Sequence, residues 1–183
     1  MKIIVITGTP ASGKSTIAGR VARRIGGAAV IRANDLVRSR RLFTSRSPDG
    51  TMVADMRKLR EAINAEIRRS CSATVIVEGH LLCEIRIRNA MVIVIREHLL
   101  TLEKRMKRRG YPEPKIRENI ISEAIDYCGF TAKRHYDKVY EIMNSRHAAR
   151  DVEGLVRETR KGNLDIELLH ELARFTKRRG WNA

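Results

Sequence analysis

Residues 8–15 read GTPASGKS, a glycine-rich stretch of the form G-x-x-x-x-G-K-[ST]. Residues 2–7 before it form a short run rich in Ile and Val, which predicts a buried parallel strand. Residues 15–25 after it carry apolar side chains at helical spacing. A phosphate-binding loop needs strand, glycine loop and helix in this order, because the glycines let successive N–H groups converge on phosphates and the helix N-terminus adds positive charge. The stretch therefore predicts a site for a nucleoside triphosphate.

Polar side chains in and beyond this loop are candidates for phosphate chemistry. Lys14 would reach the β and γ phosphates, and the Ser15 hydroxyl would ligate Mg²⁺. Glu78 ends a later apolar run, residues 74–77, where a carboxylate helps to hold Mg²⁺ or acts as a base. His80 lies two residues further on, on the same side as Glu78 if the chain stays extended, and would contact the γ phosphate or orient a water molecule. A purely structural histidine is the alternative interpretation.

The composition indicates anionic partners. The 183 residues include 37 Lys and Arg against 21 Asp and Glu, which gives a formal net charge of +16. This excess is more than a nucleotide needs and favours a larger polyanion such as RNA, or an acidic protein, although a generally basic surface is the alternative. No run of 18 apolar residues occurs, so we expect neither a membrane span nor a signal peptide. Cys71, Cys83 and Cys128 show no C-x-x-C spacing, which indicates reduced thiols in a cytoplasmic protein.

The order of apolar runs predicts one α/β domain over residues 1–183, with a five-stranded parallel sheet and helices on both faces. We expect the strands at residues 1–7, 28–31, 74–77, 90–95 and 139–143. The longer helices are expected at residues 15–25, 53–70, 99–108, 114–127, 148–160 and 164–175. Residues 40–51 are predicted to be a mobile loop, and Gly129 to break a helical pattern.

Two small insertions and several arginines complete the prediction. The insertions are expected near residues 32–55 and 109–118, and a basic helix and tail near 163–183. Arg38, Arg88 and Arg109 flank strands or the Gly-Tyr-Pro turn, and the arginine fork suits phosphate oxygens. Ligands in open parallel sheets bind at the carboxyl ends of the strands, which favours arginines placed there.

Four short motifs carry a resemblance to a known family. They are TGTP at residues 7–10, Asp35-Leu36 followed by Arg38, Glu78-Gly79-His80, and RRGY at residues 108–111 followed by Asn119 and Glu123. The chain resembles the P-loop nucleoside monophosphate kinases, and within them the small archaeal and eukaryotic nuclear adenylate kinases, also called coilin-interacting nuclear ATPases. The motifs spread over residues 1–155, most of the chain.

The resemblance implies that ATP and AMP, or another nucleoside monophosphate, react with the help of Mg²⁺ to give two diphosphates. It implies an ATP-binding loop made of Gly8, Ala11, Ser12, Gly13, Lys14, Ser15 and Thr16. It also implies a lid arginine, Arg109, a nucleotide contact at Arg146 after the last strand, and an AMP-binding segment near residues 32–55. For the AMP we expect Asp35, Arg38 and Arg88, and for catalysis Lys14, Glu78, His80 and Arg109.

The resemblance also implies an alternative activity, since the family includes ATPases that assist maturation of the small ribosomal subunit through a ribosomal protein, with rRNA as a second expected partner. Three differences between this chain and the family pattern bear on the choice between a kinase and an ATPase. Glu78 replaces the usual Asp, Ala11 replaces a Gly of the loop, and a basic tail follows residue 156. A kinase for another small hydroxyl acceptor is a third interpretation.

Overall fold

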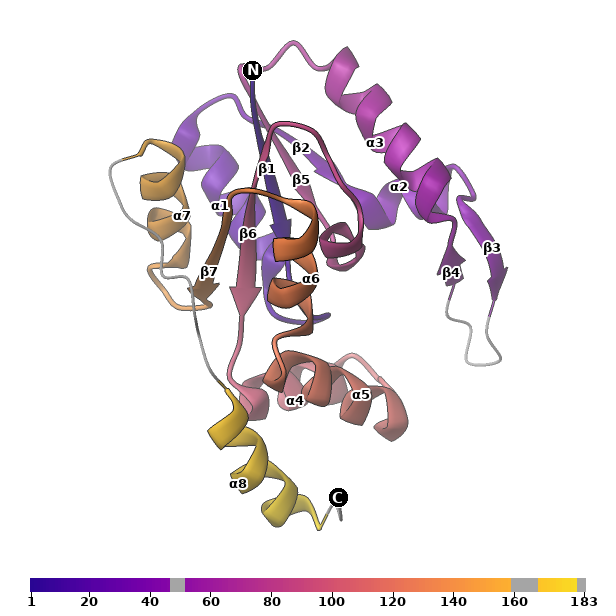
Figure 1. Ribbon diagram of the computed structural model, residues 1–183, viewed down its shortest axis with the longest axis vertical. Coiled ribbons are helices and arrows are strands. Elements are labelled where there is room, and N and C mark those ends of the chain that lie inside the picture. The colour runs from indigo at the N-terminus through magenta and orange to yellow at the C-terminus, as the bar shows by residue number, and fades with distance from the viewer. Residues whose placement is uncertain (47–51, 159–167, 181–183) are drawn as a thin grey trace.

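A parallel five-stranded sheet forms the centre of the computed structural model, which describes residues 1–46, 52–158 and 168–180. Its strands, in the spatial order β2-β5-β1-β6-β7, are β2 (Ala29–Arg32), β5 (Thr74–Glu78), β1 (Lys2–Thr7), β6 (Ala90–Arg96) and β7 (Val139–Met143) (Figure 1). All neighbouring pairs are parallel. The five strands predicted from apolar runs are therefore confirmed.

Side chains of the three central strands sort onto the two faces of the sheet. Ile4 and Ile6 of β1 pack on one face with α1 (Lys14–Ile25) and α7 (Ala148–Val156). Val5 between them packs on the other face, which is covered by α2 (Ala33–Ser39), α3 (Met56–Arg69), the 3₁₀ turn η1 (His80–Glu84) and α6 (Tyr127–His135) (Figure 1). Because helices cover both faces, the strands are continuous apolar runs rather than alternating ones.

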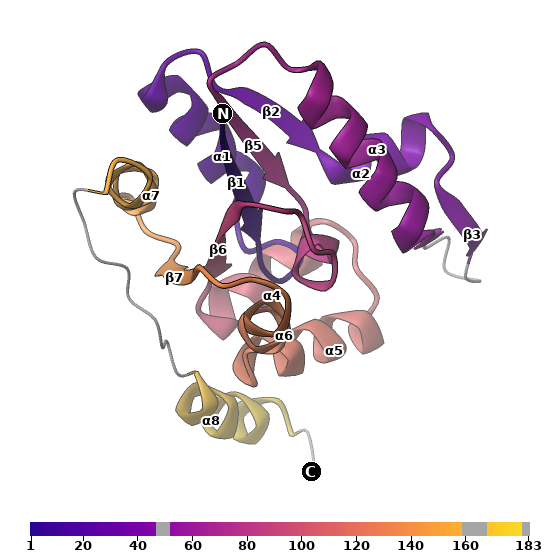
Figure 2. The same cartoon turned by 45° about the horizontal axis from the view of Figure 1, so that its top comes forward.

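A third apolar cluster lies beyond the carboxyl ends of the strands. It joins α4 (Leu99–Arg108), α5 (Glu113–Ala124) and α8 (Leu169–Arg179), with Leu102, Ile120 and Phe175 buried between them. Figure 2 shows α8 lying beside α4 and α5. Glu171 of α8 accepts a hydrogen bond from the Leu99 N–H at 3.1 Å, which places a carboxylate at the N-terminus of α4. Helix α8 therefore supports α4 and α5 and the connection between them.

The predicted loop at residues 40–51 is corrected by the structure. Strand β3 (Phe43–Arg46) lies in the described part of this segment and pairs antiparallel with β4 (Met52–Ala54) directly after the segment. Residues 47–51 of the predicted loop lie outside the described residues. Helix α3 also begins later than expected, at Met56, because the Asp55 side chain caps it by accepting from the Lys58 N–H at 3.0 Å.

Gly129 does not break a helix but lies inside α6, which corrects the second expectation. The Asp126 side chain caps this helix by accepting from the Gly129 N–H at 3.0 Å. A Cβ at position 129 would lie 2.3 Å from an Asp126 carboxylate oxygen, so this close cap requires glycine. The predicted C-terminal helix is found as α8, and residues 159–167 and 181–183 lie outside the described residues.

Candidate nucleotide site

The loop between β1 and α1 has the curled backbone that its sequence predicts. Gly8 has φ +135°, and a Cβ there would lie 2.4 Å from the Ile95 carbonyl oxygen. Gly13 has φ +101°, and a Cβ there would lie 2.4 Å from Asn144 Nδ2. Ala11 adopts φ +67°, a left-handed conformation that costs a residue with a Cβ about 1–2 kcal/mol. The surrounding structure therefore holds the loop in a conformation that Ala11 disfavours.

Lys14 is buried within this loop. Its Nζ donates a hydrogen bond to the Thr9 carbonyl oxygen at 2.8 Å. Burial lowers the pKa of the ammonium, whereas Glu78 and Glu123 act in the opposite direction. The cation therefore lies against the backbone of the loop at Thr9.

Ser15 and Glu78 are brought into contact, as a shared magnesium site requires. Ser15 Oγ donates to Glu78 Oε1 at 3.1 Å, and the Glu78 carboxylate is nearly fully buried. Both groups offer oxygen, the ligand that Mg²⁺ prefers. In the described part of the chain, no group of three or more His, Cys, Asp or Glu side chains is arranged so that it could hold a metal ion. A Mg²⁺ ion held by this pair would therefore take its other ligands from phosphates and water.

His80 begins the 3₁₀ turn η1, two residues after Glu78 at the end of β5. Gly79 between them is extended, with φ 165°, and both side chains line one cavity. Burial, followed by the charges of Lys14 and Lys115, lowers the pKa of His80 to about 4. His80 is therefore a neutral imidazole at neutral pH.

This cavity, of about 720 Å³, connects the loop with both predicted insertions. Its volume is typical of small-molecule sites. The loop side is formed by Ala11, Gly13, Lys14, Ser15 and Thr16. The α2–β4 side contributes Asn34, Val37, Arg38, Met52, Val53 and Ala54, and the α4–α5 side contributes Arg109, Gly110, Tyr111, Pro112 and Lys115. Three segments far apart in the sequence thus face one another across a single space.

Some predicted site residues do not line this cavity. Gly8 and Ser12 belong to the phosphate loop, but both residues are buried and neither lines the cavity. Asp35 is exposed in the first turn of α2. Arg88 precedes β6, and since β6 runs parallel to β1, it lies at the amino end of the sheet, whereas the loop follows the carboxyl end of β1 (Figure 1). The expectation that Arg88 reaches the acceptor is therefore corrected by the strand direction.

Arg146 lies in a separate pocket of about 420 Å³ where α1 and α7 meet. The pocket is lined by Arg20, Arg23, Arg24, Arg146, His147, Ala149 and Arg150. None of these residues lines the larger cavity. The structure therefore assigns Arg146 to a basic surface pocket beside the loop helix.

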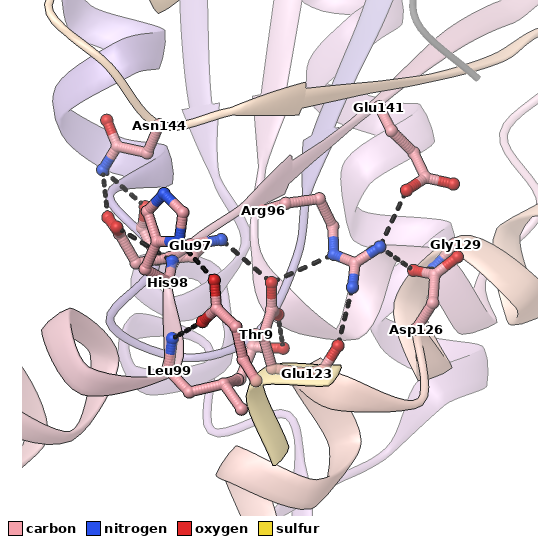
Figure 3. Close-up of polar contacts among 12 residues, drawn as sticks. Thr9, Arg96, Glu97, His98, Leu99, Glu123, Asp126, Gly129, Glu141 and Asn144 are labelled. Carbon is pink, nitrogen blue, oxygen red and sulfur yellow. Dashed lines mark hydrogen bonds and ion pairs between the residues drawn. The ribbon is translucent and has the colours of Figure 1, made fainter. Parts of the chain in front are cut away.

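Sequence reasoning missed Lys115, and it missed Glu97 and Asn144 in a group of polar side chains behind the loop. Lys115 was inside the predicted lid, and the signal that could have found it is its position three residues after Pro112, in the first turns of a helix. This group consists of the buried charges of Arg96, Glu97 and Glu123 and the half-buried amide of Asn144, whose contacts with Thr9 and one another are drawn in Figure 3. Glu123 follows the RRGY motif in the sequence, but no local pattern shows that these side chains meet, because they come from different elements.

Comparison with known proteins agrees with this geometry. The sequence model described as AAA domain matches residues 4–126. A protein named "Putative adenylate kinase" from Methanothermobacter thermautotrophicus is 34% identical, over 88% of this chain and 91% of its own length. The chain belongs to the P-loop nucleoside monophosphate kinase family. A second protein of that name, from Methanocaldococcus jannaschii, is 36% identical over 85% of this chain and 82% of its own length.

Solved structures support the fold of this P-loop kinase family member. The shikimate kinase from Bacteroides thetaiotaomicron is similar with a TM-score of 0.55 and 18% identity, over 86% of this chain and 97% of its own. The shikimate kinase from Acinetobacter baumannii, in complex with shikimate, gives a TM-score of 0.56 and 14% identity over 87% and 92% of the two chains. At this identity the likeness establishes the P-loop kinase fold alone. Within the described residues, every helix is too short or too polar to cross a bilayer.

Proposed function

We propose that the protein transfers the γ-phosphoryl group of ATP to a nucleoside monophosphate, with AMP as the first candidate. The observation that carries this proposal is the single cavity of about 720 Å³ that joins the phosphate loop to the α2–β4 segment. A triphosphate on the loop and a monophosphate against Arg38 would meet inside it. The adenylate kinase names of the archaeal relatives support AMP as the acceptor.

The cavity supplies the charges that such a transfer needs. Phosphoryl transfer depends mainly on positioning and on neutralising negative charge. Lys14 would neutralise the transferring group from the loop side, while Arg109 and Lys115 approach from the α4–α5 side. Arg38 of α2 would hold the acceptor phosphate, because its guanidinium can donate two parallel hydrogen bonds.

Ser15 and Glu78 would hold Mg²⁺ through hydroxyl and carboxylate oxygens. When bound, the ion supplies positive charge to the phosphate oxygens. His80, being neutral, would accept or donate a hydrogen bond at the transferring group without adding charge. Movement of the Arg109–Lys115 segment over the nucleotides would exclude water.

The direct test is incubation with ATP, Mg²⁺ and each common nucleoside monophosphate, followed by separation of the nucleotides by chromatography. The proposal expects diphosphate formation that depends on the monophosphate and is greatest with AMP. Absence of diphosphate above the rate of ATP hydrolysis alone would overturn it. A hydroxyl acceptor of another class would then be sought by the same measurement.

A second candidate is an ATPase that acts in assembly of the small ribosomal subunit and binds rRNA or a ribosomal protein. The arginine-lined pocket beside α1 favours it, because five arginines in one pocket suit several phosphates. The test is RNA binding at two salt concentrations by the wild type and by Arg20→Glu/Arg150→Glu, with Arg57→Glu/Arg60→Glu on α3 as control. Salt-independent binding that the pocket variant leaves unchanged would count against this candidate.

A further inference from the structure

The buried side of the phosphate loop is held by two side chains that bind its carbonyl oxygens. Asn144, directly after β7, donates from Nδ2 to the Ser12 carbonyl oxygen at 2.8 Å. Arg105 of α4 donates from Nη1 to the Ala11 carbonyl oxygen at 3.2 Å. Both residues lie far from the loop in the sequence, so only the packing of β7 and α4 brings them there.

One carboxylate, that of Glu97, holds both of these side chains. Glu97 Oε2 accepts from Asn144 Nδ2 at 2.9 Å and lies 2.6 Å from Arg105 Nη1. Its other oxygen, Oε1, accepts from the His98 N–H at 3.1 Å. Figure 3 shows the Asn144 amide pointing towards the Glu97 carboxylate. Glu97 is only 3% exposed, so its carboxylate forms its hydrogen bonds with protein groups and not with bulk water.

The geometry of a trans peptide links these carbonyl contacts to the phosphate-binding face. In a planar trans peptide the carbonyl of one residue and the N–H of the next point in opposite directions. Fixing the Ser12 carbonyl on Asn144 therefore directs the Gly13 N–H towards the other side of the loop. The peptide between Ala11 and Ser12 is held at both ends. Arg105 binds its carbonyl oxygen, and its N–H, that of Ser12, donates to the Thr9 carbonyl oxygen at 3.1 Å.

The backbone of this segment needs such support. Ala11 at φ +67° and Gly13 at φ +101° both lie outside the conformations that most residues prefer. Asn144 Nδ2 fits against Gly13 so closely that a Cβ on Gly13 would overlap it. A loop with two such residues keeps its curl only where the surrounding contacts determine it.

We propose that Glu97 is a positioning residue for phosphate binding. It orients Asn144 and Arg105, these hold the carbonyls of Ser12 and Ala11, and the N–H groups of the loop thereby stay directed at the anion. The inference rests on the proposed function only in taking this loop as the ATP site. Glu97 touches no substrate in this scheme and acts through the loop backbone.

Glu103 offers a matched control for a purely structural ion pair. It is also a fully buried glutamate, it lies on α4 with Arg105, and it pairs with Lys107 at 2.9 Å and with Arg179. Its ion pairs with Lys107 and Arg179 do not involve the phosphate loop. Loss of either carboxylate removes a buried ion pair, but only the loss of Glu97 releases the loop carbonyls.

The experiment measures binding of ATP, and of inorganic tripolyphosphate competing with ATP, by calorimetry. Glu97→Gln and Asn144→Ala are compared with the wild type and with Glu103→Gln. We expect each of the first two to weaken both ligands about tenfold, the effect of one hydrogen bond to a charged group, while Glu103→Gln changes binding less than twofold. The double variant Glu97→Gln/Asn144→Ala should bind about as weakly as the weaker single variant, because both changes break one chain of contacts.

Unchanged binding by folded Glu97→Gln and Asn144→Ala would overturn the inference, as would an equal loss in Glu103→Gln. If Glu97→Gln does not fold, Asn144→Ala decides, since it leaves the carboxylate and Arg105 in place. A wild type that binds neither ligand also overturns it. Binding that behaves as expected in a protein that forms no diphosphate would instead refute the proposed kinase function and leave the role of Glu97 standing.

Discussion

Ser15 Oγ donates a hydrogen bond to Glu78 Oε1 at 3.1 Å, which joins the first turn of α1 to the carboxyl end of β5. The two residues are 63 positions apart in the chain and belong to different strand–helix units. Their contact places a hydroxyl and a carboxylate at one end of the loop, where a magnesium–triphosphate complex has its cation. This hydrogen bond therefore joins the phosphate loop to the carboxylate that we propose as a Mg²⁺ ligand.

Replacement of Glu78 by Gln should lower turnover about 10–100-fold and raise the Mg²⁺ concentration needed for half-maximal rate. The amide keeps the volume but loses the charge that would face the cation. Steady-state rates at increasing Mg²⁺ measure both effects. The control is Glu84→Gln, which also lines the cavity but does not contact Ser15. Equal Mg²⁺ dependence in Glu78→Gln and the wild type would contradict the role of Glu78.

Replacement of Lys14 by Ala should lower phosphoryl transfer about 10³-fold, because this ammonium is the buried cation inside the loop. The fold should persist, since burial already disfavours the charged side chain. Circular dichroism checks the fold, and diphosphate formation checks the rate. A variant with wild-type turnover would refute the assignment of the loop.

His80 should make stability depend on pH. Its pKa is lowered from 6.5 to about 4 in the folded protein, so the unfolded chain binds more protons between these values. The free energy of unfolding should therefore fall as pH drops from 7 to 5, by at most about 2 kcal/mol from this group. Urea unfolding of the wild type and His80→Ala at both pH values measures the difference, and an equal pH dependence would contradict it.

The same variant tests the role of the imidazole in the reaction. His80→Ala should lower turnover more than it lowers ATP affinity, because His80 lines the cavity in which the transferring group would lie. Turnover and ATP dissociation constants are compared with the wild type. Unchanged turnover would make His80 a structural residue.

Replacement of Arg38 by Ala should raise KM for the monophosphate about tenfold or more and leave KM for ATP nearly unchanged. Arg38 lines the cavity on the α2 side. Arg88→Ala is the control, because Arg88 lies at the amino end of the sheet, and it should behave as the wild type. A larger effect at Arg88 than at Arg38 would contradict the placement of the acceptor.

Replacement of Phe175 by Ala should destabilise the protein by about 3–5 kcal/mol, because this side chain of α8 is 3% exposed and packs in the cluster with α4 and α5. Phe130→Ala provides the control, since its ring is 65% exposed on α6 and should cost little. Urea unfolding followed by circular dichroism compares them. Equal stability of the two variants would show that α8 does not support these helices.

Much of the fold follows from local patterns. The strands around residues 4–6, 75–77 and 92–95 are continuous apolar runs, and the loop at residues 8–15 carries its chemistry in adjacent positions. The antiparallel strands at residues 43–46 and 52–54 were not predicted, because they are short and largely exposed. Gly129 was misread because the Asp126 cap that requires it is a contact between side chain and backbone.

By itself the sequence determined the parallel sheet and the phosphate loop of this protein, because both are encoded by neighbouring residues. Only the tertiary structure decided which charges meet the loop. The sheet order sets β7 beside β6, and the Asn144 N–H donates to the Arg96 carbonyl oxygen at 2.8 Å, which brings Asn144 to Glu97. The strand direction likewise carries Arg88 away from the cavity while α2 carries Arg38 into it. Such contacts depend on how elements distant in the chain pack, and no local pattern contains that information.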